Sequence, residues 1–293
     1  MSSTAEFILT LSCPDKKGIV HAVSQFLLDT GCNIIESQQF GDVASHGGSG
    51  TFFMRVHFES DATFEVTALE ERFDAVGVRF AMTARFHRFG AKMRALFLVG
   101  KQGHCLNDLL FRVRAGWLNV EPIGVVSNHA DLSDLAARHG VPFHHLPLAT
   151  GADADIKRAQ EERIEALIVD ECVELVVLAR YMQILSEPFC RTLAGRAINI
   201  HHSFLPSFKG ARPYEQAHLH GVKLIGATAH YVTATLDEGP IIEQDVERVD
   251  HSLSVADMTA AGRDVEALVL ARAVRWHVEH RVLVNGMKTV VFR

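Results

Sequence analysis

Short apolar runs alternate with stretches of helical spacing after residue 94, and this alternation restricts the possible folds more than any other feature. The apolar runs are RALFLVG, VEPIGVVSN, VPFHHLP, VELVVLARYM and RAINIHHS. Helical spacing is found over about 105–115, 131–139 and 153–171. Strands that are apolar almost throughout are buried on both faces, which is typical of a parallel sheet covered by helices. We therefore predict an α/β domain with a Rossmann-like, mostly parallel sheet.

The residues before position 87 follow a different pattern. Strands are expected at 7–13 and in CNIIESQQF, GTFFMRVHFE and VRFAMTARF, with helices after the first and third of them. Asp15 is a good N-cap for the first of these helices, and Gly31 is suited to end it. The order β-α-β-β-α-β predicts a ferredoxin-like α+β unit.

The length of 293 residues suits one large domain and one small one. We place the small domain at 1–86, a polar linker at 87–93 and the large domain at 94–293. In the large domain, VKLIGATAHYV and GPIIEQDVERV are expected to extend the sheet. A long helix over about 254–280 and short strands over 281–291 are expected to follow.

Composition excludes several classes of protein. Hydrophobic residues make up 48% of the chain, so a large core can form. The net charge of −6 argues against a nucleic-acid-binding protein, which needs a basic face. No signal peptide is recognisable, and no apolar run reaches the roughly 20 residues that cross a membrane. The five scattered cysteines lack CxxC spacing and are typical of reduced thiols, so we expect a cytoplasmic protein.

The stretch INIHHSFLPSFKG combines polar side chains with the end of a buried strand. Ligands of open α/β sheets bind beyond the carboxyl ends of the strands. Asn199 and His201 are two residues apart, so in a strand their side chains share one face, and His202 is expected to point the other way. Adjacent histidines on an extended backbone rarely bind one ion, and no other ligand is near in sequence. We therefore expect no metal here.

A second polar stretch, LDEGPII, places Asp237 and Glu238 before a Gly-Pro turn. His230 and Thr233 reach the same region if the strand over 223–231 lies beside the strand that ends near Asn199. An asparagine amide, an imidazole and a carboxylate together suit carbonyl chemistry, because the first two donate to an oxyanion and the third orients the imidazole or takes a proton. No serine or cysteine is clearly paired with the histidine, which favours direct transfer over a covalent intermediate.

These residues resemble a known family. INIHHSFLPSFKGARPYEQA, LARYMQILS, GATAHYV and LDEGPII are similar to the folate-dependent formyltransferases, which include glycinamide ribonucleotide transformylase and methionyl-tRNA formyltransferase. With the first domain included, the whole chain is most similar to the hydrolytic branch of that superfamily. That branch releases formate from 10-formyltetrahydrofolate and serves one-carbon and purine metabolism.

The resemblance implies roles for individual residues. Asn199 and His201 would act on the formyl oxygen, and Asp237 would complete the catalytic set. The pterin would be held by the segment 180–185 and the loop 233–237. The implied substrate-binding residues are Arg180, Tyr181, Met182, Gln183, Ile184, Leu185, His230 and Thr233. Lys209 flanks the expected cleft, where it would attract the glutamate tail of the folate or neutralise neighbouring acids. No metal or cofactor is implied, since the folate is the substrate.

The acceptor of the formyl group separates the branches of the superfamily. A phosphate-bearing acceptor needs a loop of small residues that leads into a helix N-terminus. Here the equivalent loop, VGKQGHCLNDLL, carries the bulky Lys101, Gln102 and His104. We therefore expect water as the acceptor, with Asp237 or the His201–Asp237 pair as a base worth roughly 10²–10⁴-fold in rate. Formyl transfer to an amine such as glycinamide ribonucleotide is the alternative.

The first domain also has a family resemblance. CPDKKGIV, GCNIIE and FFMRVHF make residues 5–86 resemble an ACT domain, a regulatory module that commonly binds amino acids at paired interfaces. The resemblance implies an amino-acid effector and a homo-oligomer, either a dimer or a tetramer. A further alternative follows, in which the chain is an amino-acid-sensing protein whose second domain is inactive.

Overall fold

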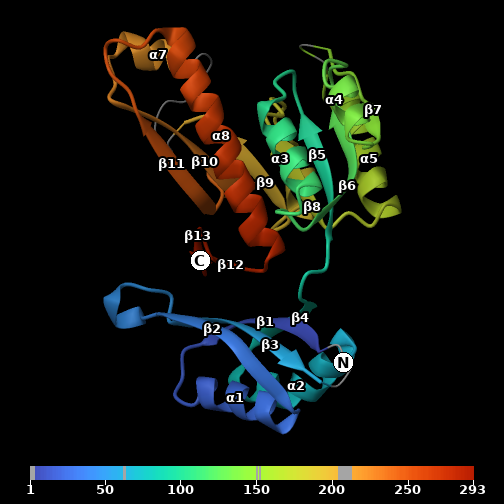
Figure 1. Cartoon of the computed structure of the whole chain (residues 1–293), viewed down its shortest axis with the longest axis vertical. Coiled ribbons are helices and arrows are strands. Elements are labelled where there is room, and N and C mark those ends of the chain that lie inside the picture. The colour runs from blue at the N-terminus through green and yellow to red at the C-terminus, as the bar shows by residue number, and fades with distance from the viewer. Residues whose placement is uncertain (1–3, 62–63, 150, 152, 204–212) are drawn as a thin grey trace. The chain divides into compact units, whose positions relative to one another are not determined.

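The computed structural model describes residues 4–61, 64–149, 151, 153–203 and 213–293. The chain divides into two compact units, of which the first comprises 1–91, 279–285 and 289–293 and the second comprises 92–278 and 286–288. Both units are coloured along the chain in Figure 1. The last residues of the chain therefore belong to the first unit, whereas the sequence placed everything from residue 94 onward in one domain.

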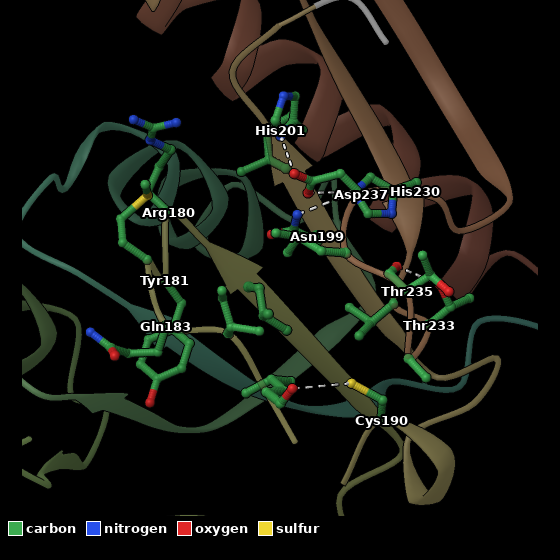
Figure 2. Close-up of a pocket in the computed structure, with 18 of the residues that line it drawn as sticks. Arg180, Tyr181, Gln183, Cys190, Asn199, His201, His230, Thr233, Thr235 and Asp237 are labelled. Carbon is green, nitrogen blue, oxygen red and sulfur yellow. Dashed lines mark hydrogen bonds and ion pairs between the residues drawn. The ribbon is translucent and has the colours of Figure 1, made fainter. Parts of the chain in front are cut away.

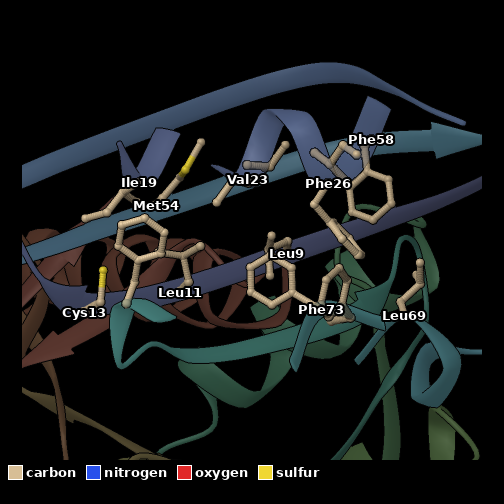
Figure 3. Packing of buried hydrophobic residues seen from close by; sticks show 14 of the residues in the cluster. Leu9, Leu11, Cys13, Ile19, Val23, Phe26, Met54, Phe58, Leu69 and Phe73 are labelled. Carbon is tan, nitrogen blue, oxygen red and sulfur yellow. The ribbon is translucent and has the colours of Figure 1, made fainter. Parts of the chain in front are cut away.

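The first unit has the order β1, α1, β2, β3, α2, β4 that the sequence predicted. The bounds are β1 (Ala5–Pro14), α1 (Ile19–Asp29), β2 (Cys32–Asp42), β3 (Thr51–Ser60), α2 (Val66–Phe80) and β4 (Thr83–Arg88), with a 3₁₀ turn, η1 (Ala44–His46). The strands lie in the order β2-β3-β1-β4, and every neighbouring pair is antiparallel. Figure 3 shows its core, where Leu9 and Leu11 of β1 pack with Phe26 and Phe73 of the two helices.

One expected cap in this unit is wrong. Helix α1 begins at Ile19, and its N-cap is Gly18, whose φ of 96° is in the left-handed region that favours glycine. Asp15 lies before this turn and caps nothing. The expected end is confirmed, because Gly31 follows the helix with φ of 72°.

The second unit is an α/β domain with a seven-stranded sheet in the order β11-β10-β9-β8-β5-β6-β7. Its strands are β5 (Met93–Val99), β6 (Val120–Ser127), β7 (Phe143–His145), β8 (Leu175–Ala179), β9 (Ala197–His201), β10 (Leu224–Tyr231) and β11 (Ile241–Arg248). The strands from β9 to β7 in that order are parallel, while β10 is antiparallel to both of its neighbours. The mostly parallel sheet and its extension by the last two strands are confirmed.

Helices cover this sheet. They are α3 (His104–Arg114), α4 (Ser133–Arg138), α5 (Ala154–Asp170), α6 (Glu187–Thr192), α7 (Pro213–Leu219) and α8 (Val255–Val278). Side chains of α5 and α6 form one buried cluster with those of β5 and β8. Figure 1 shows α3 and α8 side by side in front of the sheet, where α8 also contacts β9, β10 and β11. Among the described residues, no helix is long and apolar enough to cross a membrane.

The chain ends in a two-stranded hairpin, β12 (Val282–Asn285) and β13 (Lys288–Val291). The hairpin is tied to the sheet of the first unit by polar contacts. Arg55 of β3 is buried and donates to the carbonyl oxygen of Glu279, and Asn285 donates to Asp42 at the end of β2. Residues 279–285 and 289–293 thus complete the unit that residues 1–91 form.

Candidate active site

The pairing of β9 with β10 brings the predicted catalytic residues together. His230 lies opposite Asn199 across the two strands, as the sequence required. Beyond the carboxyl ends of β8 and β9 lies a cavity of about 310 Å³, drawn in Figure 2, and Asn199, His201 and Asp237 all line it. This is the place where open α/β sheets bind their ligands.

The residues predicted to hold the substrate line the same cavity. They comprise His230, Thr233 and all six residues of the segment 180–185, namely Arg180, Tyr181, Met182, Gln183, Ile184 and Leu185. Met182 and Ile184 are exposed, so apolar surface is available to a bound ring at the mouth of the cavity. Lys209, together with the LPSFKGA motif around it, lies outside the described residues.

Asp237 lies between two imidazoles. Its Oδ2 is 3.2 Å from Nδ1 of His201, and its Oδ1 is 3.7 Å from Nε2 of His230. The bond from His201, with the neighbouring His230, holds the pKa of the Asp237 carboxyl well below its usual range, although burial acts in the opposite direction. The residue also adopts a left-handed backbone conformation, with φ of 57°. Such strain persists only where the surroundings hold a residue in place, and it is common at functional sites.

The hydrogen bonds of His230 assign its protons. Nδ1 of His230 is 2.9 Å from the carbonyl oxygen of Tyr231, which can only accept, so Nδ1 carries a proton. In the neutral ring Nε2 then accepts, and the amide nitrogen of Asn199 lies 3.2 Å from it. While His230 is neutral, the Asn199 amide is held with its NH₂ group toward it. One N–H serves His230 and the second is available to a substrate oxygen.

His201 has one nitrogen engaged and one available. Because the ionised Asp237 can only accept, the Nδ1 of His201 that faces it carries the proton. The other nitrogen, Nε2, is buried and has no hydrogen-bond partner among the described residues. Buried polar atoms usually have a hydrogen-bond partner, so an imidazole nitrogen that lines a cavity without one is suited to react with a substrate. In the neutral ring it accepts a proton, and in the cation it donates one.

The expected orientation of His202 is wrong. The sequence predicted that this side chain turns away from His201, but it lines the same cavity, and the two rings stack with their centroids 5.1 Å apart. The period of two applies only within a strand, and β9 ends at His201. Burial, together with the charges of Arg180 and His201, lowers the pKa of His202 to about 4. His202 is therefore a neutral wall of the cavity at neutral pH.

Sequence reasoning missed the residues that hold the segment 180–185. Glu161 of α5 is buried and accepts hydrogen bonds from the backbone N–H and the hydroxyl of Ser186, the residue that follows this segment. Its neighbour Gln160 accepts a bond of 3.3 Å from the hydroxyl of Tyr181. The sequence gives no sign of these contacts, because polar residues are common on helices. Only the fold brings α5 next to the segment 180–185.

One group of possible metal ligands is present among the described residues, and it is not at the paired histidines. His104, Cys105 and Glu266 place a ligand atom each within 4.8 Å of one another. The carboxylate of Glu266 already accepts from His104 and from Tyr214, each at 2.7 Å. Burial also raises the pKa of the Cys105 thiol, which disfavours the thiolate that binds metals. The donor set therefore suits a hydrogen-bonded network better than a metal.

Known proteins are similar in sequence to this chain over its full length. Residues 93–274 match the family model described as formyl transferase. The chain is also 47% identical to formyltetrahydrofolate deformylase of Corynebacterium sp. (strain P-1) over 294 aligned positions, which cover 100% of both proteins. The chain belongs to the formyltetrahydrofolate deformylase family.

The solved structures agree with this assignment. Formyltetrahydrofolate deformylase from Burkholderia mallei ATCC 23344 is 50% identical, with a TM-score of 0.91 over 99% of this chain and 100% of that one. Glycinamide ribonucleotide transformylase 1 from Symbiobacterium toebii is 31% identical, with a TM-score of 0.64 over 71% of this chain and 97% of its own. The likeness to a member of the deformylase family thus extends over both units, whereas the likeness to the transferase leaves part of the chain unmatched.

Proposed function

We propose that this chain hydrolyses 10-formyltetrahydrofolate to formate and tetrahydrofolate. The observation that carries the proposal is full-length similarity to formyltetrahydrofolate deformylases, combined with one cavity that contains Asn199, His201 and Asp237. Transfer to an amine is the less favoured reaction, because the relatives that match both units are named deformylases. An inactive sensing protein is disfavoured by the complete catalytic set.

In the proposed reaction, Nε2 of His201 removes a proton from water as the oxygen adds to the formyl carbon. Asp237 is a weak base because its pKa is depressed, so its role is to hold the proton on Nδ1 and to stabilise the imidazolium that forms. The oxyanion accepts a hydrogen bond from the Asn199 amide. The bond between the formyl carbon and N10 then breaks, N10 takes the proton from Nε2, and formate leaves.

The pterin is assigned to the segment 180–185 and the loop 233–237, whose residues line the cavity on two sides of Asn199. Glu161 positions the first of these segments through Ser186. We infer that no further cofactor takes part, since the folate carries the formyl group and the balance of the reaction needs only water.

The decisive experiment is incubation of the pure protein with 10-formyltetrahydrofolate and no added amine. Formate and tetrahydrofolate are expected to accumulate in equal amounts, measured by an enzymatic formate assay and by absorbance. If the formyl group leaves the folate only when glycinamide ribonucleotide is supplied, the chain is a transferase and the proposal is wrong.

For the first unit we propose an ACT-like regulatory role, with an amino acid as effector and a dimer or tetramer as the working form. The support is the β-α-β-β-α-β order of this unit and the sheet order β2-β3-β1-β4. The free cysteines of the chain also support a cytoplasmic location.

Calorimetry with a panel of amino acids tests the proposed effector of the first unit, and sedimentation tests the assembly. If no amino acid binds, the unit serves assembly alone.

A further inference from the structure

Arg180 adopts an unusual backbone conformation at the end of β8. Its φ is 65°, in the left-handed region where glycine is favoured and a long side chain is rare. Its carbonyl oxygen is so close to Gly100, the residue after β5, that a Cβ atom on Gly100 would lie 2.6 Å from it. This strained position beside the cavity makes the Arg180 side chain a candidate for a function.

The guanidinium of Arg180 is buried with unused donors. Its side chain is only 10% exposed, and Nε lies 3.4 Å from Oε2 of Glu266. This contact is an ion pair without hydrogen-bond geometry. Nε and Nη1 have no hydrogen-bond partner among the residues that the structure describes. Buried N–H groups of a charged side chain are seldom left without a partner, so a ligand or a water is expected to meet them.

Glu266 of α8 forms the ion pair that holds this guanidinium. It is 1% exposed and accepts from His104 of α3 and from Tyr214 of α7. Although its burial raises the pKa, the bond from His104 and the charge of Arg180 leave the pKa of Glu266 below its ordinary value. Glu266 therefore stays ionised and keeps Arg180 in one place.

Arg180 belongs to two cavities. It lines the catalytic cavity, where Figure 2 shows it at the end at which His201 lies. It also lines a second cavity of about 340 Å³, together with Gln102, Tyr214, Thr259 and Arg263. The second cavity contains Glu215 and Glu266 besides its two arginines, so its charge does not select a free anion. Arg180 is the residue that the linings of both cavities have in common.

We infer that Arg180 is a specificity-determining residue, which excludes amines from the formyl group and leaves water as the acceptor. The inference rests on the proposed hydrolysis. Because Glu266 balances the charge of Arg180, this exclusion is steric. A neutral amine with a substituent needs the space that the guanidinium fills. Water is small and neutral, and its oxygen accepts from the unused N–H groups.

The two outcomes differ only in the nucleophile. In hydrolysis, the water oxygen bonds to the formyl carbon, the bond from that carbon to N10 breaks, and one water proton reaches N10. In transfer, the amine lone pair bonds to the same carbon, the same bond breaks, and one amine proton reaches N10. His201, Asn199 and Asp237 serve either reaction equally, so the choice depends on what can reach the carbon.

The test measures the product ratio with glycinamide, a small primary amine, in excess over 10-formyltetrahydrofolate. The wild-type chain is expected to give formate and no N-formylglycinamide above the uncatalysed level. Arg180→Gly, which suits the left-handed backbone, is expected to raise the ratio of N-formylglycinamide to formate by at least about tenfold. Arg180→Lys keeps the charge and much of the length, so the wild-type ratio is expected. Mass spectrometry quantifies both products.

If Arg180→Gly hydrolyses the folate without forming N-formylglycinamide, the inference is overturned while the hydrolase assignment stands. Should Arg180→Gly not fold, Arg180→Asn takes its place, because asparagine tolerates the left-handed backbone and is much shorter than arginine. Absence of N-formylglycinamide with Arg180→Asn then overturns the inference. A wild-type chain that forms no formate at all instead contradicts the proposed function, so the two failures are distinguishable.

Discussion

At the scale of single residues, Asp237 has the largest predicted effect, because it holds His201 in the tautomer whose Nε2 faces the cavity. Asp237→Asn replaces an obligatory acceptor by an amide that can also donate, and it removes the charge that stabilises the imidazolium. We expect kcat to fall roughly 10²–10⁴-fold, the range for lost acid–base catalysis. Steady-state formate release measures it. Asp134→Asn on the exposed surface of α4 is the matched control. Near-normal turnover of Asp237→Asn would remove this carboxylate from the mechanism.

His202 makes stability depend on pH. Its folded pKa of about 4 lies below the ordinary value of 6.5, so between these values the unfolded chain binds more protons than the folded one. Stability is therefore complete above about pH 6.5 and declines as the pH falls toward 4. For a partly exposed group we expect a loss of about 1–2 kcal/mol.

Replacement of His202 tests this dependence. His202→Asn is expected to flatten the decline when urea unfolding is measured at several values from pH 4.5 to pH 7.5. His145→Asn, at an exposed position on β7, is expected to leave the decline unchanged. Equal slopes for the wild type and His202→Asn would show that other groups cause the decline.

Residue spacing predicted that Asn199 and His201 share a face, but it did not predict all of their neighbours. Asn199 and His201 share a face because both lie in β9, and a period of two suffices to see this. The same rule failed one residue later, where the strand has ended. Arg180 was predicted to hold the pterin through its segment, yet its partner Glu266 lies on α8, and no local pattern connects the two. Contacts between elements that are far apart in sequence can be identified only once the fold is known.

At the scale of elements, α5 is predicted to control the affinity for the folate. Glu161 fixes Ser186 and with it the segment 180–185, which forms one wall of the cavity. Glu161→Gln keeps the shape of the side chain but removes its charge and leaves one acceptor oxygen for the two donors of Ser186. We expect KM to rise about tenfold with a smaller change in kcat, since the proposed catalytic residues lie on other elements.

The same helix provides the matched control. Glu162 is exposed and pairs with Arg158 on the outer surface of α5, so Glu162→Gln changes the same charge without touching the loop. KM is expected to stay at the wild-type value for this variant. If both substitutions raise KM equally, net charge rather than the position of the loop determines the affinity.

Elements with strong periodicity were predictable, and their caps were less so. The alternation after residue 94 predicted the parallel strands, and the neighbouring strands β9 and β10 followed from the order of the motifs. Asp15 has the right side chain for an N-cap, but the chain enters α1 through the left-handed Gly18 instead. Several residues in that turn could begin the helix, and propensity alone does not choose between them.

At the scale of the whole molecule, the order of residues in the chain differs from their grouping in space. The apolar pattern of the last residues predicted short strands, which are present as β12 and β13. Their grouping with the first unit was not predictable, because the contacts join residues more than two hundred positions apart, as between Arg55 and Glu279. A buried arginine in a strand gives no signal of its partner.

This arrangement predicts that the first unit depends on the C-terminus. Arg55 is 1% exposed, and it pairs with Glu36 at 2.8 Å while donating to the carbonyl oxygen of Glu279. Arg55→Ala removes the guanidinium donors from the carbonyl of Glu279 and from the half-buried Glu36, and lost hydrogen bonds of this kind typically cost about 1–3 kcal/mol. Deletion of residues 279–293 removes the hairpin altogether and is expected to destabilise the first unit further.

Hydrogen exchange is the suitable measurement, because it reports the stability of each unit separately. In both variants the amides of β1 and β3 are expected to exchange faster than in the wild type, although neither change alters these strands' own apolar core. Arg85→Ala, on the exposed side of β4 in the same sheet, is the control and is expected to preserve protection. Unchanged protection of β3 after deletion of the hairpin would mean that the first unit is stable on its own, so that the hairpin only covers its surface.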